Sequence, residues 1–167
     1  MKPLMNLDEV ELVAESDGPF EERHGDIGER IGAKKLGYSL TVVPPGKRAC
    51  PFHNHRNEEE MFLILEGTGI LRFGDKEYPL RKSDVIACPP GGRDVAHQIV
   101  NTGTVELRYL SLSTREELEV CEYPDSNKVG VFAGQRGRRD LRALFRAGDA
   151  VDYFDGEIPE TDVTGER

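Results

Sequence analysis

The sequence predicts an all-β protein, either a closed barrel or a double-sheet jelly roll. Short runs that alternate apolar and polar residues follow one another along the chain, and Gly, Pro and Asp separate them at short, regular intervals. Helical periodicity is confined to one stretch near the C-terminus. Short strands with this spacing are typical of barrels and jelly rolls, in which closure of the sheet removes unpaired edges.

The length suits a single domain. The chain has 167 residues, which is enough for one full core, and we expect one domain over residues 1–167. Within it we expect a barrel core at about residues 28–133. An N-terminal arm over residues 1–27 would precede the core, and a C-terminal segment over residues 134–167 would cover it.

The charge balance narrows the classes of partner. Lys and Arg number 22 against 31 Asp and Glu, so the net charge is −9, which argues against nucleic acid and anionic membranes as partners. No apolar run approaches the length of a membrane helix, and the first residues lack the apolar core of a signal peptide. We therefore expect a cytoplasmic protein that binds a small molecule.

The N-terminal third is predicted to contain three strands. Residues 10–14 alternate weakly, which indicates an edge strand followed by a loop that carries His24 as a solvated residue. Residues 29–43 read as two short strands broken at Gly37, and the Pro-Pro-Gly run that follows predicts a turn.

Further strands are predicted through the middle of the chain, and one helix near its end. The strands are expected at residues 59–65, 67–73, 77–80, 85–88, 97–101, 105–113, 118–123 and 128–132. Leu141, Leu144 and Phe145 have helical spacing after Asp140, a residue suited to an N-cap. We expect this short helix, over residues 140–146, to cover the core with its apolar side chains.

Two histidines at strand spacing indicate a metal site. His53 and His55 are two residues apart, so on an extended strand both imidazoles point to the same face. Glu60 begins the next apolar run, and His97 begins another strand after a Pro-Gly turn. Imidazole nitrogens together with a carboxylate suit a divalent metal such as Mn, Fe, Ni, Co or Zn.

The same residues resemble the two sequence motifs of the cupin superfamily. The first motif is matched by Gly46, His53, His55, Glu60 and Gly67. The second is matched by Ser83-Asp84, the turn Pro89–Gly91, His97 and Asn101. The run Glu119–Phe132 is also similar to the tail of small single-domain bacterial cupins of the cupin-2 conserved-barrel type. The resemblance implies a double-stranded β-helix, or jelly-roll barrel, and a homodimer.

The match departs from the motifs at three places. Ser83 stands where the second motif has Gly, and the turn before His97 is extended by Gly92–Ala96. The interval between Gly46 and His53 is one residue longer than usual. The resemblance still implies that His53, His55, Glu60 and His97 bind one divalent transition metal.

Candidate substrate contacts are fewer and less specific. Phe62 shares a face with Glu60 by alternation, Asn101 shares one with His97, and Arg93 lies on the extended turn, where it could bind an anionic group. Tyr38 is a further candidate, with a surface residue as the alternative reading, and Asn101 has the alternative role of a turn residue.

The cysteines and the acid–base chemistry are less informative. Cys50, Cys88 and Cys121 form no CxxC pair, so they read as small buried residues, and only Cys50 is close enough in sequence to His53 to face the pocket. No residue for proton transfer is identifiable from spacing.

Two classes of function follow. Four protein ligands leave about two open positions on an octahedral metal, which fits an enzyme acting on a small oxygen-rich molecule. Sugar or sugar-phosphate isomerisation or epimerisation is the activity implied by the resemblance, and a metal-dependent dioxygenase is a variant. The alternative is a non-catalytic binding or sensor module in which the metal holds a ligand.

Overall fold

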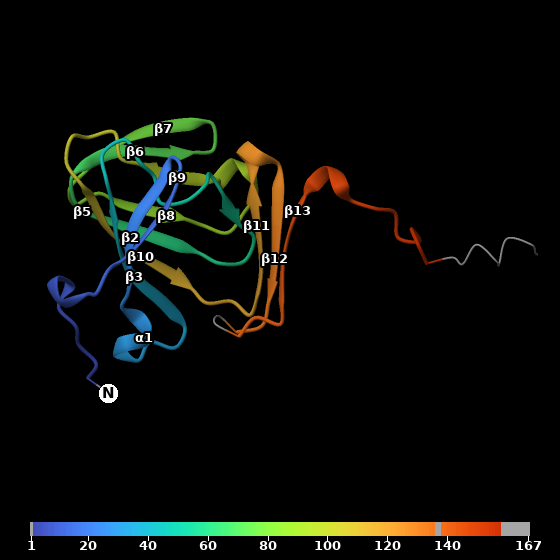
Figure 1. The fold of residues 1–167 in the computed structure, drawn as a ribbon, viewed down its shortest axis with the longest axis horizontal. Helices are drawn as coiled ribbons and strands as arrows, with labels where there is room; N and C mark the ends of the chain where they lie inside the picture. Colours follow the sequence, from blue (N-terminus) through green and yellow to red (C-terminus); the bar gives the residue numbers. More distant parts are fainter. Residues whose placement is uncertain (1, 136–137, 158–167) are drawn as a thin grey trace, which may run out of the picture.

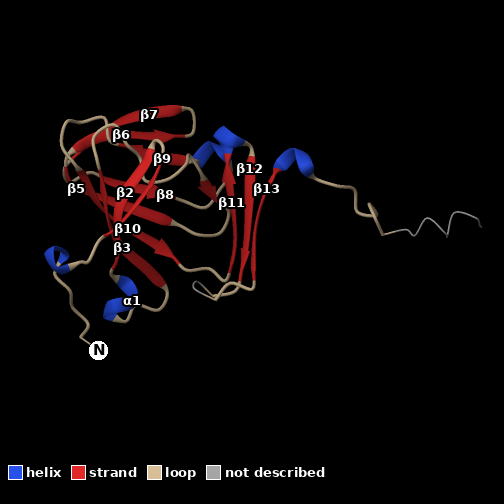
Figure 2. Cartoon of the chain, viewed as in Figure 1, coloured by secondary structure: helices blue, strands red, loops and turns tan. Residues whose placement is uncertain are grey.

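The computed structural model describes residues 2–135 and 138–157, and nearly all of the regular structure in them is β-sheet (Figures 1 and 2). The strands are β1 (Val13–Asp17), β2 (Phe20–Asp26), β3 (Leu36–Val43), β4 (Asn54–His55), β5 (Glu60–Glu66), β6 (Thr68–Phe73), β7 (Lys76–Arg81), β8 (Val85–Cys88), β9 (His97–Val100), β10 (Leu107–Thr114), β11 (Leu118–Tyr123), β12 (Lys128–Ala133) and β13 (Leu141–Arg146). One α-helical turn, α1 (Gly28–Ile31), and four 3-10 turns, η1 (Leu7–Glu9), η2 (Arg93–Val95), η3 (Pro124–Ser126) and η4 (Ala147–Asp149), complete the fold.

The strands form three antiparallel sheets. The largest has the order β1-β2-β3-β10-β5-β8, the second has the order β7-β6-β9, and the third has the order β13-β12-β11-β4. Neighbours such as β3 and β10 are far apart in sequence, which is the crossing connection of a jelly roll. The all-β jelly-roll prediction is therefore confirmed.

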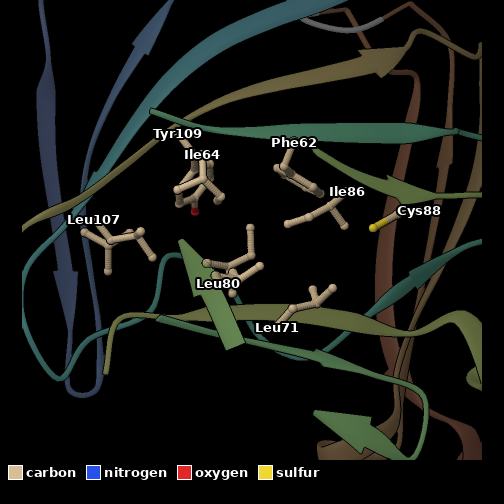
Figure 3. Packing of buried hydrophobic residues seen from close by; sticks show 10 residues of the cluster. Phe62, Ile64, Leu71, Leu80, Ile86, Cys88, Leu107 and Tyr109 are labelled. Atoms are coloured by element: carbon tan, nitrogen blue, oxygen red, sulfur yellow. The ribbon is translucent and has the colours of Figure 1, made fainter. Parts of the chain in front are cut away.

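The main core lies between the six-stranded and three-stranded sheets (Figure 3). Apolar side chains reach it from both sheets: Phe62 and Ile64 from β5, Leu71 from β6, Leu80 from β7 and Leu107 from β10. Their fractional exposure is below one tenth, so the core supplies most of the apolar burial that holds the barrel closed.

The N-terminal residues belong to the large sheet and also cover its outer face. Leu40 and Val42 of β3 pack there with Val10 and Ile27, so both faces of β3 are buried. Two predictions were wrong here. Residues 29–43 contain the rest of α1 after Gly28 and one strand, β3, instead of two strands. His24 lies within β2 instead of in a loop, because β2 pairs with β3.

The predicted C-terminal helix was also wrong. Residues 141–146 form β13, which pairs with β12 along six residue pairs, and this long-range pairing overrides the local helical spacing. Leu141, Leu144 and Phe145 are 44–48% exposed, so they do not cover the core. The chain then projects away from the barrel (Figure 1). Among the described residues, no helix is long and apolar enough to cross a bilayer.

Candidate metal centre and adjoining cavity

The barrel brings the four predicted ligands to one point. His55 lies in β4, Glu60 begins β5 and His97 begins β9. His53 forms a β-bridge with His97, in which the two backbones exchange hydrogen bonds of 3.1 and 2.7 Å. Backbone pairing, and not side-chain packing alone, therefore fixes the relative positions of these imidazoles.

One carboxylate oxygen is the centre of the arrangement. Oε2 of Glu60 lies 3.0 Å from Nε2 of His97, 3.3 Å from Nε2 of His55 and 3.8 Å from Nε2 of His53. The four side chains are between 3% and 18% exposed, so the group is largely shielded from water.

The opposite ring nitrogens are held by other groups. Nδ1 of His53 lies 2.8 Å from the carbonyl oxygen of Pro51, and Nδ1 of His97 lies 3.3 Å from that of Val95. Because a carbonyl only accepts, each Nδ1 donates, so each Nε2 faces Glu60 and can exchange its proton for a metal ion. Metal-binding histidines are oriented in this way.

The electrostatics also fit a cation at this point. Burial disfavours the charged forms of Glu60 and of the imidazoles alike. The three imidazoles nevertheless hold the pKa of Glu60 well below its usual range. Burial alone would lower the pKa of His53, but Cys50 and Glu60 outweigh it and raise the value to about 10. Nε2 of His55 is buried without a hydrogen-bond partner among the described residues. A divalent cation would replace the imidazole protons and satisfy that nitrogen, so the donor set fits the metal implied by the sequence.

A second carboxylate supports His55 from behind. Oε1 of Glu119 lies 3.7 Å from Nδ1 of His55, and Sγ of Cys121 lies 3.3 Å from the same nitrogen. Glu119 is 1% exposed, and its carboxylate accepts from the backbone amides of Arg56 at 2.9 Å and Glu58 at 2.6 Å. These contacts fix the ring of His55, and no feature of the sequence motifs indicated them.

A cavity of about 180 Å³ adjoins the site. It is lined by Glu22, His24, Asp26, Gly37, Tyr38, Ser39, Thr41, Ala49, Cys50, His53, Glu60, Phe62, Tyr109, Ser111 and Ser113. The register explains this composition, because alternate residues of β2, β3, β10 and β5 face the same side of the sheet. Ser113 is opposite Glu60 in this register. The next row along the strands contains Asp26, Ser39, Ser111 and Phe62, and the row after it contains His24, Thr41 and Tyr109.

The structure separates the four predicted substrate contacts into two pairs. Phe62 and Tyr38 line the cavity. Asn101 does not, because it is fully buried and its amide group donates to the carbonyl oxygens of Val43 and Val105, which is the turn role. Arg93 also lies elsewhere, since its guanidinium donates to the carbonyl oxygen of Pro124 beside a separate cleft. Both residues therefore lie outside the lining of this cavity.

Several cavity residues were missed from the sequence. Glu22, His24 and Asp26 alternate along β2, a signal that was available once this segment is read as a strand. Cys50, for which the sequence left both a core position and a pocket position open, lines the cavity, with Sγ 3.8 Å from Nδ1 of His53. Burial raises the pKa of Tyr109 well above its usual range, so its hydroxyl stays neutral.

Comparison with known proteins identifies the family. Residues 39–113 match the family model described as a cupin domain. An oxalate-binding protein of Thermotoga maritima is 33% identical over 95 residues, which cover 57% of this chain and 75% of that protein. The chain belongs to the cupin superfamily. The matched region contains all four candidate ligands of this cupin.

Solved structures agree with the fold. A protein from Acidithiobacillus ferrooxidans has a TM-score of 0.79 at 24% identity, covering 90% of this chain and 96% of that one. A protein from Silicibacter pomeroyi has a TM-score of 0.74 at 23% identity, covering 92% of this chain and 98% of that one. Both are named as sugar phosphate isomerases, the first provisionally. At these identities the likeness establishes the fold alone.

Proposed function

We propose that this cupin is a metal-dependent enzyme that isomerises or epimerises a small oxygen-rich substrate of the sugar type. The observation that carries the proposal is the continuity between the ligand cluster and a wall of hydroxyl groups. His53 and Glu60 line the same cavity as Ser39, Thr41 and Ser111. A hydroxyl both donates and accepts hydrogen bonds, so this wall suits a polyhydroxylated molecule held against the metal.

The chain's residues would bind and orient the substrate. His53, His55, Glu60 and His97 would hold one divalent metal, which when bound would polarise a carbonyl oxygen of the substrate. The neutral hydroxyl of Tyr109 stands in the middle of the wall, where it can donate a hydrogen bond to a substrate oxygen. Phe62 packs against the rings of His97 and Tyr109 and limits the access of water to the metal end.

The test is proton exchange in deuterated water. Protein stripped with a chelator and reloaded separately with Mn²⁺, Fe²⁺, Co²⁺, Ni²⁺ or Zn²⁺ is incubated with dihydroxyacetone, D-fructose, D-mannose and D-xylose. We expect NMR to show deuterium entering the carbon beside the carbonyl, with isomer formation, for at least one sugar and metal. Equal exchange by the metal-free protein would contradict the proposal.

A binding module is the second candidate. The relative named as oxalate-binding favours it, because oxalate chelates a metal through two oxygens without any proton transfer at carbon. The same incubations separate the two functions. Saturable binding of a sugar or of oxalate to the metal-loaded protein, with no exchange under any metal, would favour the binding module.

We also propose that the chain forms a homodimer. Exposed apolar side chains on β13, at Leu141, Leu144 and Phe145, support this, since such residues are more commonly covered. Light scattering should give twice the mass of 18.7 kDa, and a monomer mass at micromolar concentration would refute the dimer.

A further inference from the structure

We infer that the cavity selects an uncharged polyhydroxylated carbonyl compound and rejects the corresponding phosphate ester. This inference rests on the proposed function and names its substrate class. It departs from the sugar phosphate activity in the names of the structural neighbours. The reason lies in the charge of the cavity wall.

The wall contains carboxylates at both ends. Glu60 belongs to the metal end, whereas Asp26 and Glu22 come from β2. In the strand register Asp26 stands one row from Glu60, and Glu22 stands two rows beyond Asp26. A substrate that chelates the metal through its carbonyl end would therefore extend its far end toward Glu22. Among the described residues, the lining contains neither Lys nor Arg.

Two cationic side chains near the cavity, those of Arg23 and Lys47, pair with carboxylates outside its lining. Arg23, the neighbour of Glu22 in β2, binds Glu106 through both carboxylate oxygens, at 2.6 and 2.7 Å. Lys47 pairs with Glu21 at 3.1 Å. Arginine and lysine are the side chains that proteins use to hold phosphate, and these two are paired with carboxylates outside the lining of the cavity.

The two ends of the cavity differ in net charge. A divalent metal with neutral imidazoles and ionised Glu60 would leave one positive charge at the metal end, enough for one oxyanion of the substrate. A terminal phosphate dianion would lie near Glu22, with no Lys or Arg in the described lining to neutralise it. Like charges in a shielded cavity repel strongly, so the wall acts against phosphate esters while its hydroxyls bind the neutral sugar.

A matched pair of ligands tests the inference. D-erythronohydroxamate chelates a metal through its hydroxamate, and 4-phospho-D-erythronohydroxamate differs from it by a terminal phosphate. Calorimetric titration of the Mn²⁺-loaded protein at pH 8 should give at least about tenfold weaker binding of the phosphorylated compound, as Coulomb repulsion of this kind predicts. The variant Glu22→Gln should reduce that preference severalfold and keep its metal. Glu77→Gln, an exposed change on β7, is the matched control and should leave the preference unchanged.

The outcomes distinguish this inference from the function on which it rests. Metal analysis that finds no metal, or metal-loaded protein that binds neither hydroxamate, would overturn the proposed function and the inference together. Equal or tighter binding of the phosphorylated compound would overturn the inference and leave the metal enzyme intact. An unchanged preference in Glu22→Gln would show that the acidic wall does not select the substrate.

Discussion

Glu60 and Glu119 are two buried carboxylates that face His55 from opposite sides, and they are neutralised in different ways. Three imidazoles surround Glu60, and no backbone amide among the described residues donates to it. Glu119 accepts from consecutive backbone amides in the segment after β4. Glu119 is thus stabilised by backbone amides in addition to His55, whereas the charge of Glu60 is balanced by imidazole protons that a metal can replace.

This difference assigns the two sides of His55 different tasks. A carboxylate held by backbone amides is fixed in place and suits the support of a ligand. A carboxylate whose only partners are imidazoles is poised to bind a cation together with them. Glu119 and Cys121 also lie near enough to His55 to form a ligand group of their own, so the two sides can be compared by experiment.

Removal of the Glu60 charge should have the largest effect. In Glu60→Gln, the neutral amide keeps the shape of the side chain but removes the anionic ligand from the imidazole cluster. We expect the metal content after dialysis to fall at least about tenfold, measured by plasma mass spectrometry. Glu59→Gln, the change of its exposed neighbour, should retain full metal content, and equal metal in the Glu60 variant would contradict its role as a ligand.

The matching change at Glu119 should act on stability more than on metal. Glu119→Gln weakens charge-assisted hydrogen bonds to backbone amides and should lower the free energy of unfolding by about 1–3 kcal/mol in denaturant titrations. Metal affinity should fall by about tenfold while saturating metal still binds at one ion per chain. A variant as stable as the wild type, but unable to bind metal, would reverse the roles assigned to the two glutamates.

The pH dependence of the metal-free protein should sharpen the comparison. The pKa values of His53 and His55 are raised in the folded state, that of His53 to about 10, so their contribution to stability is complete below about 6.5 and is lost as pH rises toward 10. Thermal unfolding of metal-free protein should therefore show a loss of about 1 kcal/mol or more between pH 6.5 and 9.5. Metal-loaded protein, whose imidazoles carry no such protons, should lose much less stability over this range. Identical pH profiles of stability for the two forms would contradict the binding of metal by these imidazoles.

Glu22 is a third carboxylate, and among the described residues no backbone amide or imidazole neutralises it. Burial, and secondarily Glu15 across the hairpin, raises its pKa to about 7, while His24, Asp26 and Tyr109 line the same cavity. Carbon-13 NMR of labelled glutamate should show one carboxyl group that titrates near neutrality and disappears in Glu22→Gln. In Glu15→Gln its pKa should fall but stay above 4.5, because burial is the larger cause. A resonance that titrates at the ordinary value would contradict this environment.

Alternation and turn spacing in the sequence were sufficient for the all-β class, whereas the convergence of the imidazoles on Glu60 was implied by the resemblance to the cupin motifs. The motif position of Ser83 illustrates why this worked despite a departure. Ser83 keeps a left-handed φ of 74°, the conformation for which glycine is usually used. Its backbone amide donates a hydrogen bond to the carbonyl oxygen of Ile64.

Long-range pairing limited the rest of the prediction. Residues 141–146 have helical spacing, but the partner strand β12 decides their conformation. Glu119 looked like an ordinary strand residue, because its importance comes from amides more than sixty positions away in sequence. Glu22 and Asp26 became cavity residues only through the pairing of β2 with β3.

X-ray absorption spectroscopy of the Zn²⁺-loaded protein tests the central claim most directly, because it identifies the atoms bound to the metal. The account predicts three imidazole nitrogens at about 2.0–2.1 Å with carboxylate oxygen and no sulfur, unchanged in Cys121→Ser. A sulfur scatterer at about 2.3 Å that disappears in Cys121→Ser would place the metal on the Glu119 side of His55 and contradict the account.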